Sequence, residues 1–159
     1  MALSGNLVGT HYRYPDCYLV EREKVREYAT AVKNTHPAHF DEGVAGSLGY
    51  DGLAAPPTFM SVLGYVAQMA FFDSAGIGIS DSKIVQVDQM LRFRHPVTAG
   101  DELYCDVYVQ EVRQAHGTDI IVNKVVISNQ DGDVIQETYT TLAGRSEDNG
   151  ESGFNDGTA

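Results

Sequence analysis

The feature that most constrains this chain is one long, almost uninterrupted apolar segment at residues 58–72. In a helix, its apolar side chains would surround most of the circumference: Phe59, Val62, Leu63, Val66, Met69 and Ala70. Such a helix is expected to be buried on nearly all sides, so the rest of the chain must form a surface that wraps around it. Gly64 would destabilise an exposed helix, which predicts close packing or the approach of a ligand there.

Helical patterns precede this segment, and strand patterns follow it. Residues 21–33 predict an amphipathic helix, and residues 40–48 predict a short second helix that Gly49 ends. From residue 84 onward the apolar period becomes two, and four strands are expected to form an antiparallel meander: residues 84–94, 103–112, 120–127 and 134–142. In the first of these strands, one face is predicted to carry Val85, Val87, Gln89, Leu91 and Phe93.

This order of elements predicts an α+β domain in which an antiparallel sheet wraps around a long central helix, as in the hot-dog fold. A cystatin-like α+β roll has the same order of elements, and the pattern alone does not separate the two. Residues 1–145 are expected to form this single domain. Residues 146–159 are mostly Gly, Ser, Asp, Glu and Asn with one Phe, so they predict a disordered acidic tail.

The formal net charge of −11 argues against two classes of partner, because an acidic chain repels nucleic-acid phosphates and anionic membrane surfaces. Neither a secretory signal nor an apolar run long enough to span a bilayer is evident. Cys17 and Cys105 are too far apart for a CxxC pair, so a cytoplasmic protein with reduced thiols is expected. Because His11, His95 and His116 lack metal-ligand spacing, neither a metal nor a cofactor is predicted.

Residues 34–39 form a motif that reads Asn-Thr-His-Pro-Ala-His. It resembles the Asp-x-Asn-Pro-x-His signature of the R-specific enoyl-thioester hydratases and dehydratases of the MaoC-like hot-dog family. Pro37 and His39 stand in register with that signature, whereas Asn34 occupies the position of its Asp and His36 that of its Asn. The resemblance implies that the chain retains the scaffold and one half of a two-residue acid/base pair.

The replacement of Asp by Asn decides which chemistry remains. Dehydration of a 3-hydroxyacyl thioester needs a base for the C2 proton and an acid for the departing hydroxyl. His39 can act as a lone base, but the amide of Asn34 cannot exchange a proton. The loss of one of two cooperating groups costs on the order of 10²–10⁴-fold in rate. Weak or no hydro-lyase activity is therefore expected from this chain alone.

Longer strings extend the resemblance over residues 7–145, including residues 11–16, 84–89, 92–101, 115–118 and 137–144. They resemble the non-catalytic HadA-type subunits of actinobacterial (3R)-hydroxyacyl-carrier-protein dehydratases in type II fatty-acid and mycolic-acid elongation. The resemblance implies a heterodimer in which a MaoC-like partner carries the Asp and His. This chain would be the half that supports a substrate bound to acyl carrier protein or coenzyme A.

The central helix supplies most candidates for acyl binding. Under the family's geometry its N-terminus faces the thioester, and nearby side chains line a hydrophobic channel. The candidates are four channel-lining residues and two small ones that leave room for a chain: Phe59, Val62, Tyr65, Gln86, Ser61 and Gly64. Core packing alone explains each of them equally well.

Two other functions stay open on the sequence alone. One is a homodimeric acyl-thioester or lipid-binding module without catalysis, and the other is a weak hydratase that uses His39 by itself. A dimer is expected in each case, with a heterodimer preferred, because hot-dog domains bury their strand edges by pairing. Arg92 and Arg94 alternate with core residues, so they are predicted to face the same way, either toward solvent or toward an acidic carrier protein or partner subunit.

Overall fold

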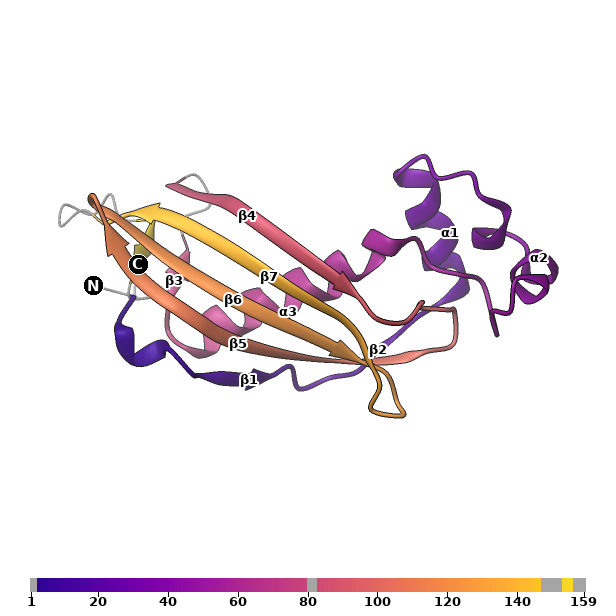
Figure 1. Cartoon of the computed structure of the whole chain (residues 1–159), viewed down its shortest axis with the longest axis horizontal. Helices are drawn as coiled ribbons and strands as arrows, with labels where there is room; N and C mark the ends of the chain where they lie inside the picture. Colours follow the sequence, from indigo (N-terminus) through magenta and orange to yellow (C-terminus); the bar gives the residue numbers. More distant parts are fainter. Residues whose placement is uncertain (1–2, 80–82, 147–152, 156–159) are drawn as a thin grey trace.

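A computed structural model of the 159-residue chain describes residues 3–79, 83–146 and 153–155. The expected order is confirmed, with the helices first and the long strands last (Figure 1). The elements before the central helix are η1 (Gly5–Leu7), β1 (His11–Arg13), β2 (Tyr18–Leu19), α1 (Arg22–Ala31), η2 (Pro37–His39) and α2 (Glu42–Ser47). The later elements are η3 (Pro57–Met60), α3 (Ser61–Ser74), β3 (Gly78–Ile79), β4 (Ile84–Phe93), β5 (Glu102–Ala115), β6 (Thr118–Ser128), β7 (Val134–Arg145) and β8 (Phe154–Asn155).

The long strands form one antiparallel sheet in the order β1-β5-β6-β7-β4, and β2 also pairs with β5. Strands β5, β6 and β7 are successive neighbours, whereas β4 lies beyond β7 and ends the sheet. Helix α3 lies along one face of this sheet, as Figure 1 shows. The predicted α+β architecture, an antiparallel sheet around one long helix, is therefore confirmed.

Helix α3 is buried on one side only, which corrects the expectation of burial all round. Its buried side chains include Leu63, Ala67, Phe71 and Phe72. Its exposed large apolar side chains are Val62, Tyr65 and Val66, and Tyr65 is 61% exposed. The physical reason is that the sheet covers a single face of the helix. A Cβ at Gly64 would lie 3.9 Å from Val125 Cγ1, an ordinary contact, so close packing does not require glycine there.

Strand β4 contains a β-bulge. Its register against β7 shifts between Gln86 and Asp88, so Val87 is the extra residue. The alternation of side chains reverses at that point, and Val85 and Gln89 face opposite sides of the sheet. The prediction of one continuous face along this strand is therefore wrong, because a perfect period of two cannot account for an inserted residue.

Helix α3 and strand β4 expose large apolar side chains on the side of the molecule where the sheet ends. We call the exposed side of α3 and the edge strand β4 together the α3–β4 face: Val62, Tyr65 and Val66 from α3, with Val85, Val87, Met90 and Phe93 from β4, of which Val85 and Met90 point to the outer side of the sheet. Val85 and Val87 are 60% and 56% exposed. Exposed edge strands with apolar side chains are a liability unless another chain or element covers them.

Helices α1 and α2 lie together at one end of the molecule, beyond the start of α3 (Figure 1). Tyr28 of α1 connects them to the central helix. Its hydroxyl donates to the carbonyl oxygen of Thr58 at 2.9 Å, and its ring packs edge-on against Phe59 with centroids 5.3 Å apart. This contact fixes the start of the central helix beside η2 and α2, where the His39 motif lies.

Residues 153–155 correct part of the predicted disordered tail. Phe154 and Asn155 form β8, which pairs with β3, and Phe154 is buried against Phe72 with ring centroids 6.4 Å apart. The ring of Phe154 stabilises this segment despite the polar residues around it, because packing removes the apolar surface of the ring from solvent. Ser146, the first residue of the predicted tail, donates its N–H to the carbonyl of Gly117 at 3.0 Å, and residues 147–152 and 156–159 lie outside the described residues.

Replacing Phe154 by Ala tests this contact. We expect Phe154→Ala to lower the free energy of unfolding by about 3–5 kcal/mol, because a buried ring is lost and a cavity remains. Chemical denaturation monitored by circular dichroism measures the change. The control Leu19→Ala removes a half-exposed side chain and should cost under about 1 kcal/mol. Equal, small effects of both variants would contradict burial of Phe154.

Candidate functional site

Three backbone segments meet beside the His39 motif and hold it in place. Residues 53–55 pair with residues 97–99 through backbone hydrogen bonds of 2.8 and 2.9 Å. The N–H of Ala54 also donates to the carbonyl of Ala38 at 3.0 Å, which joins the same segment to η2. Gly52 is required by close approach, because a Cβ there would lie 2.5 Å from a backbone oxygen of Ala99.

His39 is a buried side chain with a defined tautomer. It is 7% exposed, and its Nδ1 lies 2.6 Å from the carbonyl oxygen of Ala54. A carbonyl oxygen only accepts hydrogen bonds, so Nδ1 carries the proton. In the neutral ring Nε2 therefore retains its lone pair, and His39 is prepared to accept a proton.

Asn34 and His36 build the turn that leads into η2. The side-chain oxygen of Asn34 accepts a hydrogen bond from the His36 N–H at 3.1 Å. Nδ1 of His36 accepts from the N–H of Ala38 at 3.2 Å, so it caps the short helix. In the neutral ring the proton of His36 is then on Nε2. The rings of His36 and His39 are 5.7 Å apart and present opposite tautomers.

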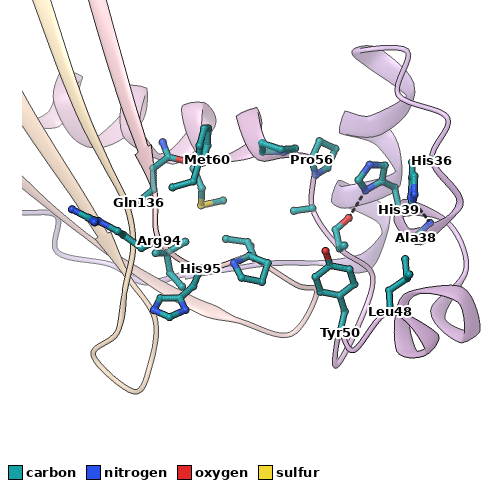
Figure 2. A pocket seen from close by; sticks show the side chains of 17 residues that line it. His36, Ala38, His39, Leu48, Tyr50, Pro56, Met60, Arg94, His95 and Gln136 are labelled. Atoms are coloured by element: carbon teal, nitrogen blue, oxygen red, sulfur yellow. Dashed lines mark hydrogen bonds between the residues drawn. The ribbon is translucent and has the colours of Figure 1, made fainter.

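A cavity of about 650 Å³ opens beside these histidines. Figure 2 shows His36 and His39 at one end of it and Arg94, His95 and Gln136 at the other. Its wall combines η2, the chain before α3, the loop after β4 and the start of β7: His36, Ala38, His39, Leu48, Tyr50, Ala54, Ala55, Pro56, Pro57, Met60, Phe93, Arg94, His95, Pro96, Val97, Ile135 and Gln136. His39 of the predicted pair lines this cavity, whereas Asn34, in the turn before η2, is not among its lining residues.

Several lining residues escaped the sequence analysis. Tyr50 and Gln136 belong to segments that the sequence reads as a turn and a strand, and nothing in those patterns marks them as part of a site. His95 appeared only as a histidine without metal-ligand spacing. The available signal was the segment 92–101, which contains His95 and resembles the strand-end segment of the MaoC-like family.

The six predicted acyl-binding residues separate into three environments. Ser61, Gly64, Tyr65 and Gln86 line a second, smaller cavity of about 240 Å³ between α3 and the sheet. Phe59 is fully buried in the core, and Val62 is exposed on the α3–β4 face. A role of these side chains in substrate binding stays a prediction.

A charged cluster lies on the outer face of the sheet beside the first cavity. The carboxylate of Glu137 accepts from Lys124 at 2.6 Å and from Arg94 at 2.8 Å. These two hydrogen bonds lower the pKa of Glu137 from 4.5 to about 2. Arg92 lies over the ring of Tyr139 at 5.3 Å. Arg92 and Arg94 thus contact the same outer face of β7, as their alternation predicted.

Comparison with known proteins identifies the family. Residues 6–138 match the family described as FAS1-like, dehydratase domain region, and the chain belongs to this family. A UPF0336 protein of Mycobacterium leprae is 59% identical over 159 residues, which cover 100% of both chains.

Two solved structures define the relationship further. A chain of the C-terminally truncated HadBC (3R-hydroxyacyl-ACP dehydratase) complex from Mycobacterium tuberculosis is 42% identical, with a TM-score of 0.80. The match covers 91% of this chain and 100% of that chain. A MaoC-like dehydratase is 36% identical with a TM-score of 0.79, over 89% of this chain and 43% of that one. The chain therefore has the MaoC-like hot-dog fold, and the cystatin-like alternative is set aside.

Two further features were sought in the described ranges. No helix there has the length and apolar composition needed to cross a bilayer. Nor do three or more His, Cys, Asp or Glu side chains come together there in a group that could hold a metal ion.

The Glu137 cluster gives a pH-dependent prediction. Because the folded-state pKa of Glu137 is depressed, its stabilising effect is present above pH 4.5 and is lost as the pH falls toward about 2. Glu137→Gln should therefore lower the free energy of unfolding by about 1 kcal/mol at neutral pH. The difference in stability between the variant and the unaltered chain should vanish as the pH approaches about 2. Denaturant titrations across this range test it. Glu111→Gln, which alters an exposed pair with Arg113, is the control and should have little effect. A difference independent of pH would refute the assignment.

Proposed function

We propose that this chain is the substrate-supporting subunit of a (3R)-3-hydroxyacyl-thioester dehydratase. Its partner is a MaoC-like subunit that carries the catalytic Asp and His, and the substrate is attached to acyl carrier protein or coenzyme A. The observation that carries the proposal is Asn34 at the position of the acid, in a chain that retains His39 and the surrounding scaffold. The family and the 42% identity to a chain of the HadBC dehydratase complex support the same class of reaction.

The proposed division of labour follows from protonation chemistry. His39 presents Nε2 as a base, but dehydration also needs a group that protonates the leaving hydroxyl. The amide of Asn34 cannot do this, and its oxygen already accepts from the His36 N–H. The efficient acid/base pair is therefore assigned to the partner. The cavity next to His39 and the space beside α3 are assigned to holding the substrate.

The α3–β4 face is the proposed surface for the partner. Strand β4 ends the sheet, and Val85 and Val87 are more than half exposed on it. Pairing of this edge with the corresponding strand of a second hot-dog subunit would satisfy its backbone and remove the apolar side chains from water. We place the assembly in the cytoplasm, in type II fatty-acid or mycolic-acid elongation.

The direct test is hydration of a trans-2-enoyl thioester, followed by loss of enone absorbance. The chain alone, the MaoC-like partner alone and their mixture are compared at equal concentration. We expect little turnover by this chain and full turnover only by the mixture. A stable self-dimer that binds acyl thioesters without turnover, and ignores the partner, would instead support a non-catalytic binding module.

Restoring the carboxylate gives a second prediction. Asn34→Asp keeps the oxygen that accepts from the His36 N–H and adds a group that can exchange a proton. We expect it to raise hydration by the chain alone on the order of 10²-fold. The double variant Asn34→Asp/His39→Ala should lose this gain. Strong activity of the unaltered chain that His39→Ala removes would show instead that the chain is a hydratase by itself.

A charge on the α3–β4 face tests the proposed partner surface. Val87→Asp should weaken association with the partner at least ten-fold, because a carboxylate would be buried without a counter-charge. Val8→Asp is the matched control, since Val8 is exposed but lies outside that face. Sedimentation or native mass spectrometry of the mixtures measures both. Equal association of the two variants would place the partner on another surface.

A further inference from the structure

Side chains with polar groups line much of the second cavity, where a hydrocarbon channel was expected. Seven of its ten lining residues carry a hydroxyl or amide group: Ser61, Tyr65, Gln68, Gln86, Gln89, Thr138 and Thr140. The other three are Met60, Gly64 and Val125, and none of the ten is charged. A wall of this composition offers hydrogen bonds but no counter-ion, so it fits an uncharged polar ligand.

The β-bulge in β4 produces part of this wall. Gln86 and Gln89 are three residues apart, so they would face opposite sides of a regular strand. Because Val87 is the extra residue, both face the inner side of the sheet and line the same cavity. Bulges of this kind redirect side chains at functional positions. Two amide side chains are thereby added to a surface that β7 already supplies with two threonines.

Asn123 is an independent sign of a polar environment. It is 0% exposed on β6, and its cross-strand partner is Thr140, which lines the cavity. Neither its side-chain nitrogen nor its side-chain oxygen has a hydrogen-bond partner within the described part of the chain. Buried amide groups in native proteins are almost always satisfied by protein, water or ligand. Asn123 therefore places a buried amide behind the cavity wall, beside Thr140.

The polar wall continues into the cavity that contains His39. Met60 lines both cavities. Gln136 lines the first cavity and donates from its side-chain nitrogen to the hydroxyl of Thr138, which lines the second, at 2.8 Å. The two cavities therefore adjoin at Met60 and at the hydrogen-bonded pair Gln136 and Thr138.

We infer that the second cavity binds an uncharged stretch of substrate that bears hydroxyl, carbonyl or amide groups, and not bare hydrocarbon. This assignment rests on the proposed function for the identity of the substrate. An alkyl chain in this cavity would remove water from the polar side chains without replacing their hydrogen bonds, which is unfavourable for each group. A polar chain replaces those bonds. Two sources share this chemistry: an oxygen-bearing acyl tail and the two amides of a pantetheine arm.

Side-chain amide signals in NMR spectra of the isotope-labelled full-length chain test the inference directly. The reporters are the NH₂ groups of Gln68, Gln86, Gln89 and Asn123. Three probes are titrated: pantetheine, a medium-chain acyl pantetheine thioester, and the same thioester with a hydroxyl in the middle of its tail. Because the measurement uses this chain alone, it does not depend on association with a partner or on turnover, so its failure is distinguishable from failure of the proposed function.

The expected result is that a polar group moves these signals. Shifts caused by pantetheine alone would identify the arm as the occupant, and shifts caused only by the hydroxylated tail would identify the acyl chain. Thr140→Val should weaken binding of the probe that shifts these signals roughly ten-fold, because valine has nearly the shape of threonine but lacks its hydroxyl. Thr141→Val, on the outer face of the same strand, is the matched control. Gln68→Met provides a second test if Thr140→Val fails to fold.

Three results would overturn the inference. The first is tighter binding of the plain acyl chain than of its hydroxylated counterpart. The second is a Thr140→Val variant that folds and binds the probes as well as the Thr141→Val control does. The third is the absence of any shift at the four reporter side chains with all three probes.

Discussion

The structure depends on one geometric constraint: a single curved sheet covers one side of α3 and leaves its other side bare. Burial of Leu63, Ala67 and Phe71 against the sheet holds the helix in place. The same arrangement exposes Val62, Tyr65 and Val66 next to the side of β4 that pairs with no other strand among the described residues. A fold of this kind gains stability when the exposed side of α3 and the edge strand are covered, and pairing with a second chain of the same fold would cover both.

The site follows from the same framework. The start of α3 is fixed by Tyr28, and the chain before it pairs with both η2 and residues 97–99. That pairing presents the carbonyl of Ala54 to His39 and sets its tautomer. The scaffold of an acid/base centre is thus intact around a base, although Asn34 stands where the family motif has an acid. Under the proposed function, a subunit with this base and no proton donor supports a reaction that its partner carries out.

The sequence predicted the architecture well because long periodic segments determine it. The change from a helical to a strand period near residue 84 predicted the order of helices and strands. The motif at residues 34–39 pointed to His39 as a candidate site residue. Three features were not predictable. The bulge at Val87 depends on pairing with β7. Burial of Phe154 comes from one ring in a polar segment, without any period. Asn123 occupies an inward position that an alternating strand reserves for apolar side chains.

The central claim is that a catalytic partner covers the α3–β4 face. Hydrogen–deuterium exchange of the chain, alone and mixed with the MaoC-like subunit, tests it most directly. The account predicts that amides of β4 and the exposed side of α3 become protected on mixing, while those of β1 at the opposite edge of the sheet do not change. Protection confined to β1, or unchanged exchange in β4 within a formed complex, would contradict it.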